Sequence, residues 1–165
     1  MTHDMNQLLQ TIATAFRAAG GKLGVVESCT GGGLGQAITS LPGASDFFEG
    51  GLITYSNTVK MKSVYVREST LNEHGAVSEE CVKEMANGGM VALGVDCCLS
   101  ISGVAGPDGG SPEKPVGTVW FGLAVRHRSI EAFKCQFEGD RQQIRASAVS
   151  EALRILSKVS LKRAV

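Results

Sequence analysis

Leu-Gly-Val-Val-Glu-Ser-Cys-Thr-Gly-Gly-Gly occupies positions Leu23 to Gly33, where an apolar run passes into small and polar residues. The apolar half, Leu23–Glu27, contains two β-branched valines and is typical of a strand that is buried on both faces. The second half breaks the strand, and residues 34–41 then have the pattern of a helix that Pro42-Gly43 ends. A buried strand that turns tightly into a helix is a building unit of α/β sheets.

A second buried strand, at 97–102, also runs into a glycine-rich loop, at 103–110. Short polar residues at 126–129 separate two later strands and predict an antiparallel hairpin. This order of elements predicts an α/β sandwich with a mixed sheet, built as a single domain over residues 1–165. The remaining expected strands are 51–55, 117–125 and 130–137, and the remaining helices are 5–19, 56–66, 77–93 and 140–156.

Composition excludes several classes of protein. The 165 residues include 16 basic and 16 acidic side chains and therefore carry no formal net charge. A neutral chain has no field to steer nucleic acid or an anionic membrane towards it, so we expect neither partner. No apolar run approaches 18 residues, and the five cysteines are odd in number and lack a C-x-x-C spacing. We therefore expect a reduced, cytoplasmic protein with no metal or cofactor.

The 21 glycines are about an eighth of the chain, nearly double the ~7% that is usual. Eight of them fall in two stretches, 31–35 and 103–110, which contain the loops that follow buried strands. Such loops present unpaired backbone amides, which fit a phosphate, a carboxamide or a developing oxyanion. The structural alternative is a pair of tight turns. Because strand-end loops converge on one crevice in open sheets, we expect the two loops to meet. Candidate binding residues there are Cys29, Thr30, Gly31 and Gly32, with Ser102, Gly103, Ala105 and Gly106.

Two adjacent residues are candidate nucleophiles. Ser28 lies where a strand passes into a helix, an arrangement that exposes a hydroxyl next to helix amides. The same position also suits a helix N-cap, which is the commoner role of such a serine. Cys29 is the rival, since a thiol is intrinsically the more reactive group, with His74 as its candidate base.

A lysine whose pKa is lowered by burial can replace histidine as the base. Lys60 and Lys62 are the candidates, because they follow the strand that ends in Tyr55-Ser56-Asn57. A phenol at Tyr55 would relay a proton or align the serine, and Asn57 is a candidate binding residue. The residue spacing leaves open the alternative that the lysine is a solvated helix residue.

Two arginines one turn apart open the last helix. Arg141 and Arg145 lie on the same face and would bind a phosphate through their guanidinium groups. A solvated helix start capped by Asp140 is equally compatible with the spacing. Ser111 and Lys114 match S-x-x-K, but they lie in a Pro/Gly loop rather than on a helical turn, so we interpret the match as coincidental.

Six motifs in a fixed order closely resemble the CinA C-terminal-domain family, and in particular its stand-alone nicotinamide-nucleotide amidases. The motifs run from Glu27 to Arg141 and the flanking helices fit too, so the resemblance covers nearly the whole chain and is far more specific than any single loop. The motifs are Glu27–Gly33, Tyr55–Lys60, His74–Ser78, Ser102–Gly110, Lys114–Trp120 and Gly139–Arg141.

The resemblance implies a three-layer α/β/α domain that hydrolyses nicotinamide mononucleotide to nicotinate mononucleotide and ammonia in NAD recycling. It implies that Ser28 is the nucleophile, Lys60 the general base and Tyr55 the assisting phenol, in place of Cys29 and His74. It also implies a homodimer, for which the apolar stretch 120–124 is the candidate contact. The larger N-terminal domain that some relatives carry is absent from these 165 residues, and its activity is not implied.

Overall fold

The first predicted strand lies inside a five-stranded sheet of order β2-β1-β3-β4-β5 in the computed structural model, which describes residues 3–161. β1 (Leu23–Glu27) is buried along its whole length and pairs in parallel with β2 (Phe48–Ile53) and with β3 (Cys97–Gly103). β4 (Thr118–Val125) pairs antiparallel with β3, and β5 (Glu131–Gln136) forms the expected hairpin with β4. The mixed α/β sheet is therefore confirmed.

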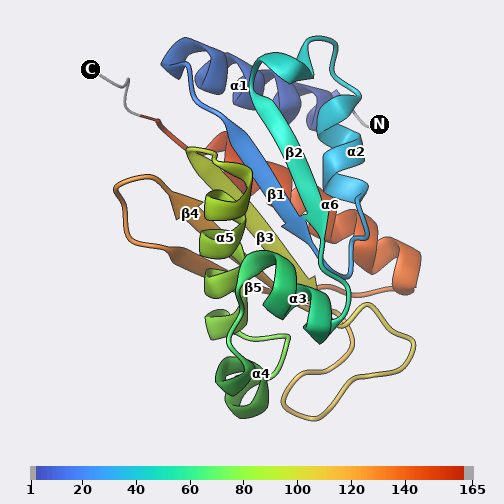
Figure 1. Cartoon of the computed structure of the whole chain (residues 1–165). Helices are drawn as coiled ribbons and strands as arrows, with labels where there is room; N and C mark the ends of the chain where they lie inside the picture. Colours follow the sequence, from blue (N-terminus) through green and yellow to red (C-terminus); the bar gives the residue numbers. More distant parts are fainter. Residues whose placement is uncertain (1–2, 162–165) are drawn as a thin grey trace.

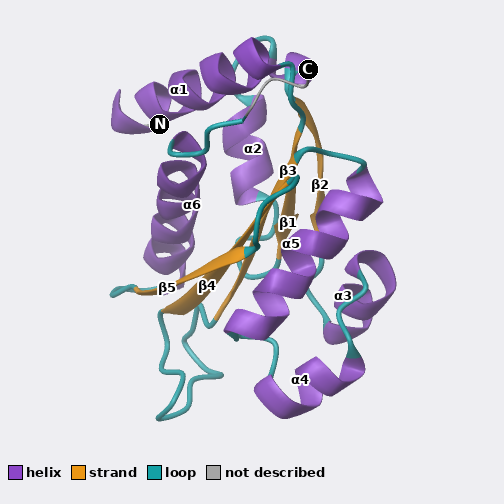
Figure 2. Cartoon of the chain, turned by 90° about the vertical axis from the view of Figure 1, so that its left-hand side faces the viewer, coloured by secondary structure: helices purple, strands orange, loops and turns teal. Residues whose placement is uncertain are grey.

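Helices cover both faces of the sheet, as Figure 2 shows edge-on. Each face has its own apolar core, so the expected three-layer α/β/α architecture is confirmed. One face carries α1 (His3–Ala19), α2 (Gly33–Thr39) and α6 (Arg141–Ser157), and the other carries α3 (Asn57–Val64), α4 (Glu68–His74) and α5 (Glu79–Leu93).

The carboxyl ends of three strands meet at one edge of the sheet (Figure 1). Glu27, the last residue of β1, pairs with Ile53 on one side and with Ile101 on the other. The residues that follow these strand ends are therefore neighbours in space although they are distant in sequence. The chain thus brings Ser28, Thr54 and Ser102 to the same edge, which is where open α/β sheets bind ligands.

Two expectations about elements were wrong. β2 begins at Phe48, three residues earlier than expected, because Gly50 and Gly51 weaken the strand pattern in its first half. α4 was absent from the expected helices, since its seven residues bury only Thr70 and so show no apolar repeat. A short 3-10 turn at Ala44–Asp46 also lies before β2.

The stretch 120–124 is an internal part of β4, between β3 and β5. Phe121 and Ala124 are fully buried and Leu123 is nearly so. Most of the apolar surface that suggested a contact between subunits is therefore used within the chain. Within residues 3–161, no helix combines the length and the apolar character that crossing a membrane requires.

A glycine allows α3 to pack closely on α5. A Cβ atom added at Gly88 of α5 would lie 1.8 Å from the carbonyl oxygen of Val64, the last residue of α3. Real Cβ atoms do not approach an oxygen so closely, and the obstacle is backbone rather than a mobile side chain. Any larger residue at this position must therefore displace α3.

We expect Gly88→Ala to lower the free energy of unfolding by about 2 kcal/mol or more, because the overpacking outweighs the better helix propensity of alanine. Asn87→Ala is the matched control, since Asn87 is the exposed neighbour on the same helix. Urea denaturation of both variants checks this. Equal stabilities would show that α3 and α5 have room to separate.

Candidate functional site

Ser28 follows β1 directly, and its backbone is fixed on both sides. Its N–H donates to the carbonyl of Ile101 at 3.0 Å, and its own carbonyl accepts from Gly31 at 3.1 Å. The N-cap of α2 is Gly32, which has a left-handed φ of 96° that favours glycine. The N-cap role considered for Ser28 is therefore wrong, and its hydroxyl is left for another contact.

That contact is the side chain of Lys60. Ser56 caps α3 through its hydroxyl, and one turn later Lys60 points inward and is only 1% exposed. Its Nζ lies 3.1 Å from Ser28 Oγ, 2.8 Å from the Thr54 carbonyl and 3.3 Å from the Tyr55 carbonyl. Lys62, the other candidate, is exposed on the same helix.

The partners of Lys60 suit an amine that loses its proton. Two of them are carbonyl oxygens, which only accept hydrogen bonds. A neutral amine has two N–H groups and one lone pair. If the N–H groups point at Thr54 and Tyr55, the lone pair faces the Ser28 hydroxyl. Burial also lowers the pKa of Lys60, because the charged form loses its hydration.

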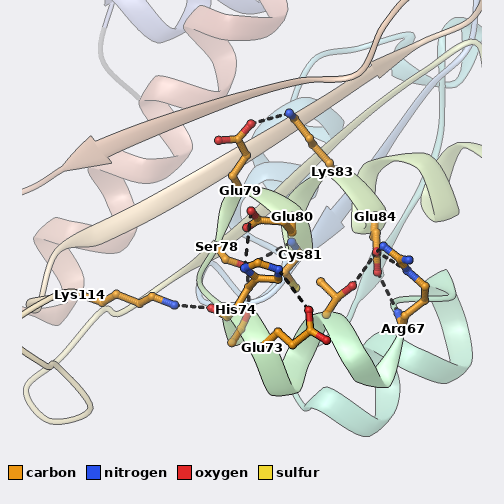
Figure 3. Close-up of polar contacts among 12 residues, drawn as sticks. Arg67, Glu73, His74, Ser78, Glu79, Glu80, Cys81, Lys83, Glu84 and Lys114 are labelled. Carbon is orange, nitrogen blue, oxygen red and sulfur yellow. Dashed lines mark hydrogen bonds and ion pairs between the residues drawn. The ribbon is translucent and has the colours of Figure 1, made fainter.

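The rival pair, Cys29 and His74, is not assembled. Burial raises the pKa of the Cys29 thiol to about 11, so the thiol is protonated at neutral pH. His74 ends α4, is exposed, and lies between Glu73 and Glu80, 3.8 and 3.6 Å away (Figure 3). It does not line the cavity next to Ser28.

Both glycine-rich loops open onto one cavity of about 270 Å³. The expected convergence of the two loops is therefore confirmed. The cavity gathers nine of the candidate residues, namely Ser28, Cys29, Tyr55, Asn57, Lys60, Ser102, Gly103, Ala105 and Arg141. Ala76 and Val77, which belong to the motif His74–Ser78 but were not candidate site residues, form the rest of its wall.

Tyr55 and Arg141 contact each other at this cavity. The phenol is 64% exposed and accepts a hydrogen bond of 3.4 Å from Arg141. Arg141 also donates to the Gly106 carbonyl at 2.8 Å, which ties the start of α6 to the second loop. The cavity wall therefore carries a guanidinium group that is accessible to an anion.

The other candidate residues lie outside this cavity. Arg145 donates to the Thr30 carbonyl at 3.0 Å, and both residues line a separate cavity between α2 and α6. Gly31 and Gly32 form the turn into α2, and Gly106 contributes its carbonyl to Arg141. Among residues 3–161, no group of three or more His, Cys, Asp or Glu side chains is placed to hold a metal ion.

The first loop has two kinds of backbone amide. Gly31 and Gly33 donate within the loop, and Gly32 donates to the carboxylate of Glu27. In the described part of the chain, the N–H groups of Cys29 and Thr30 donate no hydrogen bond to another residue. Both amides follow Ser28 directly, but only Cys29 lines the cavity next to Ser28, because Thr30 is buried and lines the separate cavity.

Sequence reasoning missed two contributors to the site. Side-chain motifs cannot predict the Thr54 carbonyl, because it accepts a hydrogen bond from Lys60 through its backbone position and not through its side chain. The second is Glu27, which the sequence indicates by an acidic residue at the end of an apolar strand. Its side chain is only 2% exposed, and a buried carboxylate requires partners.

Comparisons with known proteins agree with this architecture. The family model described as the CinA C-terminal domain matches residues 5–160. The nicotinamide-nucleotide amidohydrolase PncC of Escherichia coli K12 is 48% identical over 154 residues, which are 93% of each chain. A CinA-like protein of Thermotoga sp. RQ2 is 51% identical over 136 residues, which are 82% of this chain and 33% of that one.

Solved structures show the same fold. The competence/damage inducible protein CihA of Agrobacterium tumefaciens superposes with a TM-score of 0.91 at 33% identity, over 94% of this chain and 95% of that one. A CinA superfamily protein of Klebsiella pneumoniae 700603 gives 0.88 at 39% identity, over 93% and 96%. The family match, the identities and the shared fold all cover nearly the whole chain, which therefore belongs to the CinA C-terminal domain family.

Proposed function

We propose that this protein is a nicotinamide-nucleotide amidase, which hydrolyses nicotinamide mononucleotide to nicotinate mononucleotide and ammonia in NAD recycling. The observation that carries the proposal is the buried contact of 3.1 Å between Ser28 Oγ and Lys60 Nζ at a cavity. The activity named for the relatives with nearly half of their residues identical supplies the substrate.

Acylation begins when Ser28 Oγ attacks the carboxamide carbon and Lys60 takes the hydroxyl proton. The carbonyl oxygen becomes an oxyanion, which the N–H group of Cys29, the residue after Ser28 in the cavity wall, stabilises. As the C–N bond breaks, the protonated Lys60 gives its proton to the departing nitrogen. Ammonia leaves, and the nicotinoyl group remains as an ester on Ser28.

Deacylation repeats these steps with water. Lys60 takes a proton from the attacking water, and the proton then returns to Ser28 Oγ as the ester breaks. The products are the free carboxylic acid and the regenerated serine. The reaction consumes one water molecule and releases one ammonia.

The rest of the cavity has separate roles in binding. Arg141 holds the phosphate with its guanidinium group, and its bond to the phenol of Tyr55 places that ring at the cavity. Asn57 and the second loop, through Ser102, Gly103 and Ala105, surround the nucleotide. Arg145 holds the first loop by donating a hydrogen bond to the Thr30 carbonyl, on the side of the separate cavity between α2 and α6.

Ser28→Ala and Lys60→Met are each expected to lower kcat at least about 100-fold, because either change removes the nucleophile or its base. Lys62→Ala is the matched control and should keep the activity, since Lys62 is an exposed residue of the same helix. The measurement is ammonia release from nicotinamide mononucleotide, with substrate binding followed by calorimetry. Turnover that survives in Ser28→Ala and is lost in Cys29→Ala would transfer the nucleophile to Cys29.

The same assay tests the substrate. We expect turnover of nicotinamide mononucleotide in preference to free nicotinamide and the dinucleotide, because a terminal phosphate and a carboxamide must be bound together. Tight binding without any ammonia would instead indicate a non-catalytic nucleotide-binding module. Faster turnover of another nucleotide amide would support the proposed serine/lysine hydrolysis but contradict nicotinamide mononucleotide as the substrate.

Activity is expected to rise with pH, because only the neutral amine of Lys60 accepts a proton. Burial lowers the pKa of Lys60 below the ordinary 10.5, so the rising limb should lie below pH 10.5. The dependence of kcat/KM on pH measures this rising limb. A limb above pH 7 is distinct from the titration of the substrate phosphate, which occurs at about pH 6. Activity that falls as the pH rises from 7 to 9 would contradict a lysine base.

A further inference from the structure

Glu27 makes an unusual set of contacts for a carboxylate next to a proposed nucleophile. It is the last residue of β1, and its side chain is 2% exposed. Its Oε2 accepts from the N–H groups of Gly32 and Leu34 at 3.0 and 3.1 Å, and its Oε1 accepts from Gly35 at 2.8 Å. Within residues 3–161, no lysine or arginine forms an ion pair with it.

These bonds join the end of β1 to the first turn of α2. The three donors belong to the helix N-terminus, whose amides have no partner inside the helix. The carboxylate satisfies them and is itself stabilised by the positive end of the helix dipole. Only Ser28 to Gly31 lie between the two anchored ends, so the bonds fix the span of the loop that carries the serine.

We propose that Glu27 is a positioning residue that holds Ser28 and its neighbouring amides in the geometry of attack. This inference rests on the proposed function of the site. It has two parts: the carboxylate fixes the loop next to Lys60, and it occupies the amides of α2. The start of α2 is therefore closed to the substrate phosphate, and the amide of Cys29, which lines the cavity, is left for the oxyanion.

The contacts require a carboxylate of this length. A glutamine at position 27 keeps one acceptor oxygen but turns an NH₂ group towards an N–H donor, which leaves a buried amide without a partner. An aspartate keeps the charge and both oxygens but is one methylene shorter, so it cannot reach all three amides from the same backbone position. Both changes let the loop move, and displacement by about 1 Å at a reacting centre costs up to about 100-fold in rate.

The experiment compares Glu27→Gln with Glu84→Gln. Glu84 is the control because its carboxylate also accepts from three donors, the backbone and Nε of Arg67 and the hydroxyl of Thr70, and in addition forms an ion pair with Arg67. These contacts join α4 to α5 and lie outside the cavity (Figure 3). Kinetics with nicotinamide mononucleotide, thermal unfolding and labelling of Ser28 by a small sulfonyl fluoride are measured for each variant.

Glu27→Gln is expected to lower kcat about 10- to 100-fold with little change in KM, and to slow the labelling of Ser28 by a similar factor. Glu27→Asp should retain more activity than Glu27→Gln, because it keeps the charge and both acceptors. Glu84→Gln should lower the unfolding temperature and leave kcat and labelling unchanged. The labelling rate does not depend on which nucleotide is the substrate, so it tests the role of Glu27 even if the proposed substrate is wrong.

Two results would overturn the inference. The first is a folded Glu27→Gln protein whose kcat and labelling rate match those of the unsubstituted chain. The second is failure of both Glu27 variants to fold while Glu84→Gln folds, which would make Glu27 a determinant of folding and not of positioning.

Discussion

Burying the amine of Lys60 removes it from water, and three oxygen atoms take the place of the water molecules that it loses. Those oxygens come from Ser28, Thr54 and Tyr55, which follow the ends of β1 and β2. The charged form of an amine pays more for burial than the neutral form does. Burial therefore favours the neutral form of Lys60, which can act as a base. The same contacts place its Nζ next to the Ser28 hydroxyl.

The strand order of the sheet makes the contact between Lys60 and Ser28 possible. Parallel pairing of β1 with both neighbours aligns three strand ends, so Ser28 and Thr54 lie side by side. The helix that carries Lys60, α3, packs closely on α5 at Gly88. On the other face, the bonds from Glu27 to α2 fix the loop that carries the serine. The helices on both faces of the sheet thus contribute to the placement of Lys60 Nζ and Ser28 Oγ.

Periodicity predicted most of the fold, because β1, β3 and the hairpin are strongly apolar and the long helices repeat their apolar residues. It failed for α4, whose seven residues bury almost nothing, and for the glycine-rich start of β2. The motifs predicted nine of the residues that line the cavity, whereas five other candidate residues lie outside it. The motifs did not predict that Lys60 faces inward and Lys62 outward, or that backbone carbonyls complete the site, since both depend on how α3 docks.

The most direct test of this account is the titration of Lys60 itself. NMR of the chain labelled with ¹³C at the lysine Cε positions follows each amine separately, and Lys60→Met identifies the signal. Because burial lowers its pKa, Lys60 is expected to titrate below the ordinary lysine value of 10.5. A Lys60 signal that titrates at or above 10.5 would contradict it, because the amine would then stay charged and could not accept the proton of Ser28.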